Sequence, residues 1–153
     1  MTTTLTFACA LASGLVAGVF YAFSSFVMQG LGRLPAAQGA AAMHSINVTA
    51  VRPPFMAGFM GTTLLCLAAL VVAATGAREA GWLVAGSLLY LVGCFGVTMA
   101  FNVPRNNALM AADADAPETA ELWQRYLREW TAWNHVRTVA ALGGAGAFTA
   151  WLT

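Results

Sequence analysis

Two stretches of the sequence gather polar side chains that could hold or activate a small molecule. The first is "FNVPRNNAL", residues 101–109, where three asparagines and an arginine directly follow a long apolar run. The second is "WNHVRT", residues 133–138, which brings an amide, an imidazole and a guanidinium together. Amides and a guanidinium donate hydrogen bonds to oxyanions, and a histidine accepts protons near neutral pH. Together they indicate chemistry on a ligand that carries oxygen.

The helix that contains the second stretch has two distinct faces. Glu121, Arg125 and Glu129 recur every four residues and predict a solvated face with charge pairs. A second set, made of aromatic residues, an amide, an arginine and an alanine, recurs at three- and four-residue steps, which predicts an inward-facing stripe. This stripe consists of Trp123, Tyr126, Trp130, Trp133, Asn134, Arg137 and Ala141. Arg137 on such a face needs hydrogen-bond acceptors.

No acidic residue lies in an apolar run where it could pair with Arg137. The remaining acceptors are the amides of Asn47, Asn102, Asn106 and Asn107. We expect these amides to face the tryptophan-lined side of the last helix, where they help to satisfy Arg137 and His135. Each group also has a structural explanation as an interfacial aromatic, a helix cap or a cation that reaches the headgroups. Ionisable groups that converge at one level within a membrane are nevertheless candidates for function.

The sequence favours a site without metal. His44 and His135 are the only histidines, and no cysteine stands near either. A metal held by this pair with weak partners is the alternative. The three cysteines, Cys9, Cys66 and Cys94, lie far apart, and no pair has the spacing of a redox motif. Each lies inside an apolar run, which predicts a small buried side chain.

The composition places the chain in a membrane. Of its 153 residues, 59% are hydrophobic and only 8% are charged, and the mean hydropathy is +0.71. A soluble domain has about a quarter charged residues. We therefore expect one integral membrane domain with the lipid bilayer as its surroundings. The net charge of +1 and the lack of a basic run give no indication of a nucleic-acid partner.

The apolar runs predict an all-α fold, an antiparallel four-helix transmembrane bundle in which short turns join neighbouring spans. The expected spans are residues 4–29, 54–75, 82–102 and 118–152, with only the second half of the last one in the bilayer. Pro104 is expected to end the third span, because its ring blocks helix continuation. A short interfacial helix is expected between the first two spans, after Pro35, with Met43, Ile46 and Ala50 on one stripe.

Two further signals concern the last helix and the orientation. Asp115 and Glu118 form a capping-box pattern at the start of the long fourth helix.

Six of the seven arginines lie in residues 29–54 and 102–137, and Arg78 alone lies on the other side. The positive-inside rule then puts both termini outside, in the inner or plasma membrane of a bacterium. Gly14 and Gly18 form a small-xxx-small pair, and a homo-oligomer is one possible partner state.

The motifs resemble one known family. "NVPRNNAL", "LWQRYLREW" and "WNHVRTVAAL", together with "GLVAGVFYAFSSFVMQGL" and "MHSIN", are similar to the anthrone-oxygenase-like family of small four-span membrane proteins. Its characterised fungal members oxidise anthrones to anthraquinones, whereas most bacterial members have no assigned reaction. The resemblance covers nearly the whole chain. The positions that match its motif are Asn102, Pro104, Asn106, Asn107, Trp130, Asn134, His135, Arg137 and Thr138.

The resemblance implies a membrane oxygenase that acts on a lipophilic, electron-rich aromatic of the anthrone type. An anthrone that loses a proton can pass an electron directly to O₂, so the expected co-substrate is O₂ and no cofactor is expected. The catalytic candidates are Arg137 and Asn102, which would hold the oxyanion, and His135, which would act as base. The expected substrate-binding residues are Asn47, Asn106, Asn107, Tyr126, Trp130, Trp133 and Asn134.

The alternative is a small membrane protein without enzymatic activity. In that case the polar cluster fixes the helix register, and the chain serves as a ligand-binding or partner subunit. A ligand-sized cavity with Arg137 in its wall would favour the enzyme, and a tightly filled cluster would favour the alternative.

Overall fold

The computed structural model describes residues 1–113 and 116–153, and these residues contain helices and turns but no strand. The predicted all-α class is therefore confirmed for this part of the chain. A continuous helical rod opens the chain and contains a π-helical segment near its end. It is followed by a short helix and a second long one. These elements are α1 (Thr2–Ala22), η1 (Phe23–Val27), α2 (Met28–Gly32), α3 (Ala36–Ala50) and α4 (Pro53–Ala74).

The second half of the chain forms two more rods. The first passes through two π-helical segments without interruption, and the second is a single α-helix of 36 residues, the longest in the described part of the chain. These elements are α5 (Ala80–Leu88), η2 (Leu89–Gly96), η3 (Thr98–Asn102), α6 (Val103–Ala111) and α7 (Pro117–Leu152). Pro53 and Pro54 occupy the first turn of α4, which needs no N–H from these positions.

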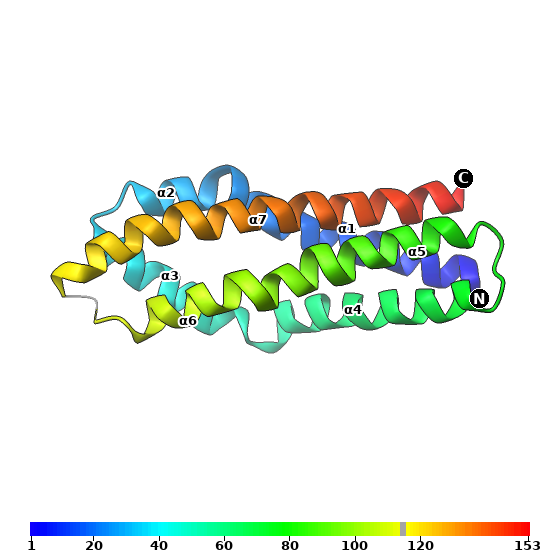
Figure 1. Ribbon diagram of the computed structural model, residues 1–153, viewed down its shortest axis with the longest axis horizontal. Helices are drawn as coiled ribbons and strands as arrows, with labels where there is room; N and C mark the ends of the chain where they lie inside the picture. Colours follow the sequence, from blue (N-terminus) through cyan, green and yellow to red (C-terminus); the bar gives the residue numbers. More distant parts are fainter. Residues whose placement is uncertain (114–115) are drawn as a thin grey trace.

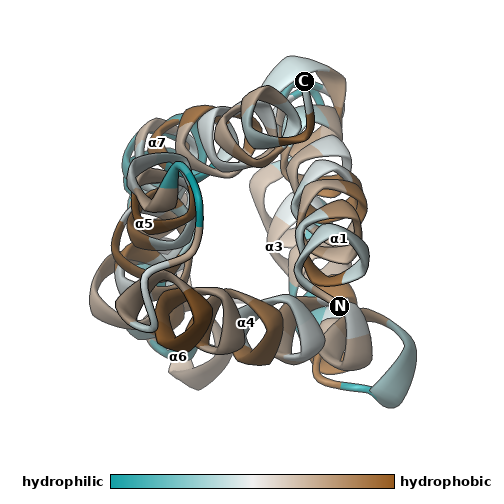
Figure 2. Cartoon of the chain, turned by 90° about the vertical axis from the view of Figure 1, so that its right-hand side faces the viewer, coloured by the Kyte–Doolittle hydropathy of each residue, from teal (hydrophilic) through white to brown (hydrophobic). Residues whose placement is uncertain are grey.

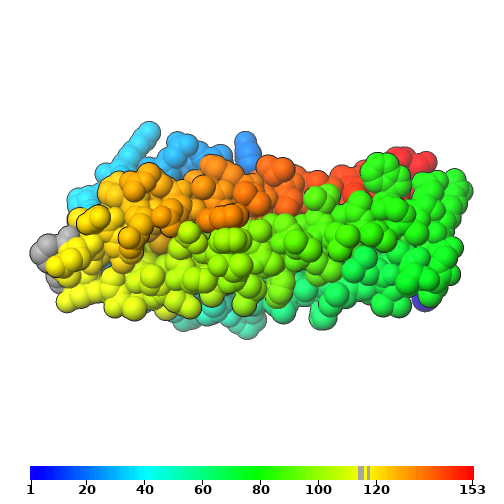
Figure 3. Space-filling model, viewed as in Figure 1, coloured from blue at the N-terminus to red at the C-terminus, as the bar shows by residue number. Residues whose placement is uncertain are grey.

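The long helices lie side by side and alternate in direction along the molecule (Figure 1). α1 contacts α4 and α7, and α5 contacts the same two helices, so the four form a closed ring that is seen end-on in Figure 2. Both termini lie at one end, near the turn that joins α4 to α5. α3 lies at the other end against α7. Figure 3 shows α7 packed along the rod of α5 and α6 over the length of the molecule.

Three of the rods are long and apolar enough to cross a membrane: Thr2–Gly32, Pro53–Ala74 and Ala80–Ala111. Their side chains point outward to a large extent, as those of lipid-facing helices do. α7 does not belong to this group. Its first half carries several charged side chains, and Arg137 together with the glycines lowers the mean hydropathy of its second half. A fourth span in α7 therefore stays a prediction.

The expectation that Pro104 ends the third helix is wrong. The helix continues through α6 to Ala111, and Pro104 lies in the first turn of α6 directly after η3. A proline in a helix lacks an N–H, and its ring clashes with the carbonyl four residues earlier. A π-helical turn is wider than an α-helical one, so the segment before Pro104 accommodates the ring and lets the helix continue.

The side chains between the rods form two apolar clusters. One, toward the termini, contains the three cysteines together with Phe20, Phe59, Tyr90 and Phe148, among other residues. All three cysteines are buried and form no disulfide, which confirms their prediction as small buried side chains. The other cluster, near α3, contains Met28, Met43, Leu109 and the aromatic residues Trp123, Tyr126 and Trp130.

Glycines let α5 and η2 approach α7 closely. A Cβ at Gly93 would lie 2.6 Å from the Cβ of Ala140, and one at Gly86 would lie 2.9 Å from the ring of Phe148. Contacts this short are not tolerated, so these positions hold glycine for packing reasons. The capping box predicted from Asp115 and Glu118 lies outside the described residues, since it depends on Asp115.

Candidate polar site in the helical ring

The inward stripe predicted for the last helix is confirmed in α7. Trp123, Tyr126, Trp130, Asn134, Arg137 and Ala141 are all buried. Trp133 is partly buried at the edge of this stripe. The residues predicted to form the solvated face, Glu121, Arg125 and Glu129, are all exposed. Glu129 pairs with Arg105 of α6 at 2.9 Å between Nη2 and Oε2, which joins the two rods at the rim of the ring.

Arg137 lies at the centre of the polar site, with only 4% of its surface exposed. Its Nη1 donates to Thr98 Oγ1 at 3.2 Å, and its Nη2 donates to Asn134 Oδ1 at 2.6 Å. Its guanidinium carbon lies 4.1 Å from the ring centre of Phe20 and 5.0 Å from that of Trp130. Aromatic faces attract a cation, and the effect grows when water is excluded. No carboxylate of the described residues pairs with it.

Asn134, fully buried, positions the guanidinium. Its Nδ2 donates to the Phe20 carbonyl and to Ser24 Oγ, both at 2.7 Å. These bonds orient the amide so that Oδ1 faces Arg137. Thr138 Oγ1 donates its proton to the Asn134 carbonyl at 2.8 Å, so Ser24 is the donor in the 3.1 Å bond between the Ser24 and Thr138 hydroxyls. The network joins the first rod firmly to α7.

The amides of the third rod hold the aromatic part of the stripe. Asn106 Oδ1 accepts from Tyr126 Oη at 2.8 Å and from Trp130 Nε1 at 2.7 Å. Asn102 Nδ2 donates to the Trp130 carbonyl at 3.2 Å. Burial raises the pKa of the Tyr126 phenol, so this group is a neutral donor at physiological pH. The prediction that amides from the end of the third span face the tryptophan-lined side of α7 is correct for Asn102 and Asn106. The prediction that they help to satisfy Arg137 is wrong, because Arg137 donates to Thr98 and Asn134 instead.

The π-helical segments supply polar side chains to the network around Arg137 from two directions. Ser24 belongs to η1, and Thr98 and Asn102 belong to η3. In η1 the backbone hydrogen bonds of the helix are disturbed locally. Ser25 Oγ donates to the Tyr21 carbonyl, and Asn134 Nδ2 donates to the Phe20 carbonyl. Such π-helical turns occur frequently at functional sites. Their position beside the one buried guanidinium of the described residues supports a functional role.

Several buried polar atoms in this region have no hydrogen-bond partner among the described residues. They include Arg137 Nε, Asn102 Oδ1, Asn47 Nδ2 and Trp123 Nε1. Native proteins satisfy nearly all such atoms with protein groups, water or ligands. The site therefore offers unused donors and at least one unused acceptor.

Some predicted site residues lie apart from Arg137. His135 is exposed on the outer side of α7, and Asn107 is exposed on α6. The ring of Trp133 stacks on Phe101 with 3.6 Å between ring centres. Asn47, from α3, is buried beside Tyr126. The expectation that the amides satisfy His135 is wrong, because successive residues of a helix point about 100° apart and Asn134 takes the inward position.

His44 is also exposed. No group of three or more histidine, cysteine or acidic side chains is close enough to hold a metal ion among the described residues. The alternative metal site of His44 and His135 thus consists of two exposed side chains, from α3 and α7.

Four residues that touch the network were not among the predicted site residues. Phe20 and Ser24 come from the first rod, Thr98 comes from η3, and Thr138 appeared only as part of the family motif. A hydroxyl residue in an apolar helix was the available signal, but such residues commonly bond to their own backbone, as Thr62 and Thr63 do. Only the helix packing distinguishes a hydroxyl that bonds to its own backbone from one that bonds to another helix.

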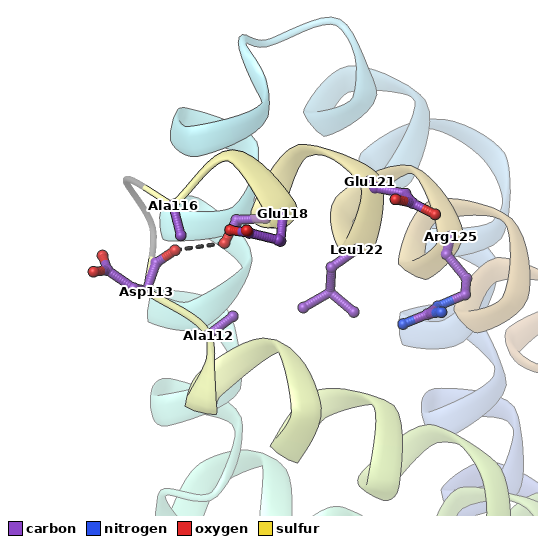
Figure 4. A pocket seen from close by; sticks show the side chains of 8 residues that line it. Ala112, Asp113, Ala116, Glu118, Glu121, Leu122 and Arg125 are labelled. Atoms are coloured by element: carbon purple, nitrogen blue, oxygen red, sulfur yellow. Dashed lines mark hydrogen bonds between the residues drawn. The ribbon is translucent and has the colours of Figure 1, made fainter.

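Two cavities lie near the ends of the ring. One, of about 390 Å³, is lined by residues of α7 and of the segment before it, and Figure 4 shows Leu122 and Arg125 along one side and Asp113 and Ala116 at the loop. The other, of about 170 Å³, lies between the α4–α5 turn and the end of α7. Neither has Arg137 in its wall. Because the rings of Phe20 and Trp130 lie against the guanidinium and Arg137 is only 4% exposed, a ligand that reaches it has to displace these rings.

Comparison with known proteins identifies one family. The model of the anthrone oxygenase family matches residues 54–147, which is more than half of the chain. The match includes Asn102, Asn106, Trp130, Asn134 and Arg137. It leaves out the first rod and α3, which contribute Phe20, Ser24 and Asn47. The chain matches no curated protein and no solved structure.

Proposed function

The chain belongs to the anthrone oxygenase family, and on this premise we propose that it is a membrane-bound oxygenase. Its substrate is a lipophilic, electron-rich aromatic of the anthrone type, and O₂ is the co-substrate. The observation that carries the proposal is the guanidinium of Arg137, which is buried between two aromatic rings without a carboxylate among the described residues. A buried cation of this kind stabilises negative charge that develops on a bound molecule.

The reaction balances without an external electron donor. The methylene group between two aryl rings of an anthrone becomes a carbonyl, one oxygen atom of O₂ enters that carbonyl, and the other leaves as water. The loss of a proton from the anthrone gives a delocalised anion whose charge lies largely on oxygen, and this anion transfers an electron to O₂. The protein contributes a dry aromatic surround and donors for the oxyanion.

Each residue of the site has a distinct role in this proposal. Arg137 and Asn102 contact the substrate oxygens. Asn134 is a positioning residue that holds Arg137, and Asn106 positions the rings of Tyr126 and Trp130. The rings of Trp130 and Phe20 have to move apart to admit a flat substrate. We assign no direct role as base to His135, because its side chain is exposed.

The test is oxygen uptake and quinone formation with an anthrone supplied in detergent micelles. The wild-type protein is expected to exceed the spontaneous oxidation in empty micelles. Arg137→Gln is expected to lower the rate to near that background, because the buried charge is lost. Arg105→Gln is the matched control, since Arg105 lies in α6 and pairs with Glu129 at the rim. A wild-type rate equal to the background would reject the oxygenase.

A metal chelator, and added copper or iron, form a second arm of this assay. Unchanged activity in chelator would support a route without metal. A loss that one metal restores would make His44 and His135 candidate ligands again.

The second candidate is a non-enzymatic ligand-binding or partner subunit whose polar cluster is structural. The hydrogen bonds of both terminal nitrogens of Arg137 within the protein, and the absence of Arg137 from the walls of both cavities, favour this candidate. It predicts that Arg137→Gln lowers stability, while the wild-type protein gives no oxidation above background.

For the membrane arrangement, we propose that the second half of α7 is a fourth span and that both termini lie outside a bacterial plasma membrane. The packing of α7 along α1 and α5, which belong to rods that can cross a membrane, supports the fourth span. The concentration of arginines at the end opposite the termini supports the orientation. A homo-oligomer through Gly14 and Gly18 stays a hypothesis, for which the exposure of Gly18 leaves room.

A further inference from the structure

One wall of the helical ring is built from two pieces. The other three walls are continuous helical rods, Thr2–Gly32, Ala80–Ala111 and Pro117–Leu152. In the fourth wall, α4 packs on α1, α5 and η2, whereas α3 packs on α2, α6 and α7. α3 therefore closes this wall at the end of the molecule opposite the termini, as Figure 1 shows.

The helical backbone is broken at both ends of α3. Pro35 before it and Arg52 after it have non-helical backbone angles, with ψ of 141° and 159°, and no side chain caps the start of the helix. Val51, beside the second break, is 71% exposed. Exposed residues at the ends of an element absorb the backbone rotation of a hinge. α3 is thus a helix between two points at which the chain can bend.

The outer face of α3 differs from the lipid-facing surfaces of the rods. Gln38, His44, Ser45 and Thr49 are exposed there, with Val48 as the large apolar exception. The rods instead expose mainly leucine, valine and other large apolar side chains. A helix with such a polar face lies at the boundary between membrane and water. Its movement there does not carry polar groups into the hydrocarbon.

Few side chains hold α3 in place. Its buried residues are Gly39, Ala40, Met43 and Asn47, of which only Met43 has a large apolar side chain, and Ile46 packs beside them partly buried. Hydrophobic stabilisation grows with the apolar area that is removed from water. Elements that bury little apolar surface open at a lower free energy than the rest of a protein, and active-site lids are such elements. α3 has this property.

The contact between α3 and α7 leaves two buried donors without a partner among the described residues. Asn47 Nδ2 lies on the α3 side, beside Tyr126, and Trp123 Nε1 lies on the α7 side. Trp123 Cε2, the atom bonded to Nε1, would lie 2.8 Å from a Cβ at Gly39. Buried donors of this kind are costly, and water satisfies both when the helices separate. The closed position therefore carries a penalty that opening relieves.

The aromatic part of the inward stripe lies against α3. Met43 and Ala40 belong to one apolar cluster with Trp123, Tyr126 and Trp130. The rings of Trp123 and Tyr126 stack with 5.7 Å between centres, and those of Tyr126 and Trp130 with 6.0 Å. Trp130 in turn lies against the guanidinium at the polar site. This row of three rings leads from the inner face of α3 to the polar site.

We propose that α3 is a lid that bends at Pro35 and Arg52 and opens a route to the polar site along the row of rings. The closed position covers Trp123 and Tyr126, and the open position gives a ligand access to them. The proposal goes beyond the proposed function, and only the aromatic nature of the admitted ligand rests on it. The competing possibility is a fixed plug, which leaves α7 only when the whole protein unfolds.

Thiol labelling measures the opening. Ala40 lies on the inner face of α3 and is 5% exposed, so a cysteine there is shielded while the lid is closed. The full-length Ala40→Cys protein in micelles is treated with N-ethylmaleimide, and the labelled residues are identified by mass spectrometry. The three native cysteines are internal controls, since each is 0% exposed. Ala147→Cys, at a position of α7 that is 7% exposed, is the matched control in a continuous rod.

Ala40→Cys is expected to react at least roughly tenfold faster than Ala147→Cys and the native cysteines, because α3 opens without the rods. Equal rates would show that α3 is a fixed plug and would overturn the proposal.

Hydrogen exchange of the wild-type protein gives an independent measurement. The amides of residues 43–48 in α3 are expected to exchange faster than those of residues 121–129, which lie in the charged first half of α7. Equal protection of the two segments would also overturn the lid. This comparison needs no variant.

Gly39→Ala tests the contact that holds the lid closed. The new Cβ would lie 2.8 Å from the Trp123 ring and 2.9 Å from the Leu31 carbonyl oxygen, so it strains the closed position. Added to Ala40→Cys, it is expected to raise the labelling rate by about five- to hundredfold and to leave the native cysteines unreactive. Gly30→Ala, with nothing within 4 Å of its Cβ, is the control and should leave the rate unchanged.

An unchanged rate in Gly39→Ala would contradict the closing contact. Labelling of the native cysteines in this variant would show that it unfolds, and the Ala40→Cys and hydrogen-exchange comparisons then decide.

None of these measurements uses an anthrone, so they separate the lid from the proposed function. Fast labelling of Ala40→Cys without oxidation of an anthrone would reject the oxygenase and retain the lid. Oxidation above background with an unreactive Ala40→Cys would retain the oxygenase and reject the lid.

Discussion

Replacement of Arg137 by alanine tests whether the buried guanidinium organises the site, and Arg125→Ala is its control. Both arginines lie on α7, but Arg137 is buried in the hydrogen-bond network and Arg125 is exposed. The first variant removes the donor to Asn134 Oδ1 and the contacts with the rings of Phe20 and Trp130. We expect Arg137→Ala to be the less stable of the two.

The magnitude follows from these contacts. An acceptor left unsatisfied in the interior costs about 1–3 kcal/mol, and the cation–π contacts contribute about 0.5–2 kcal/mol. Relief of the burial of a charge offsets part of the loss. The net destabilisation expected for Arg137→Ala is roughly 2–4 kcal/mol. An exposed substitution such as Arg125→Ala changes stability by about 0.5 kcal/mol or less.

The assay is thermal unfolding in detergent, followed by circular dichroism. For a protein of this size, 1 kcal/mol corresponds to a change in Tm of about 2–4 °C. Arg137→Ala is thus expected to melt roughly 4–16 °C below the wild type, and Arg125→Ala within about 2 °C of it. Equal melting temperatures for the two variants would refute the inward, hydrogen-bonded position of Arg137. A more stable Arg137→Ala would show that charge burial outweighs every contact it makes.

Three further predictions concern the base, the packing and the topology. His135→Ala should retain most of the anthrone turnover, because the ring is exposed and apart from the network, and a large loss in a folded protein would restore His135 as base. Gly93→Ala should lower Tm by several degrees, since its Cβ would lie 2.6 Å from that of a facing alanine, whereas Gly14→Ala, with open space around it, should not; similar effects would contradict the close packing of η2 on α7. A single cysteine introduced into residues 76–80 should react with an impermeant thiol reagent on intact cells, and one at Ala112 should be protected; the reverse pattern would invert the proposed topology.

The sequence determined the helical elements and the faces of α7 with little help from packing. Helical periodicity depends on local geometry, and a residue type repeated at three- and four-residue steps falls on one side whatever the helix contacts. Trp123, Tyr126, Trp130, Asn134 and Arg137 were therefore predicted as inward residues, and they are buried. The same geometry explains why His135, one position after Asn134, points elsewhere.

Pro104 shows where local rules fail. The rule that proline stops a helix assumes α-helical geometry on its N-terminal side. The chain instead adopts the wider π-helical turn of η3 and continues to Ala111. Side chains on either side of Pro104 bond around this turn. Asn102 reaches the Trp130 carbonyl and Arg105 reaches the Phe101 carbonyl, and the first of these acceptors belongs to another rod.

The tertiary structure alone decided which polar groups from other helices join the network around Arg137. Ser24 and Thr98 are far apart in sequence from each other and from α7, and each could have bonded to its own helix or to a lipid headgroup. Their convergence results from the alignment of η1 and η3 against α7, which depends on the axial positions of whole rods. Those positions are set by contacts such as Gly93 against Ala140, in which the lack of one side chain brings two helices together. A sequence pattern records which face of a helix is inward, but the level at which two faces meet is a property of the packed molecule.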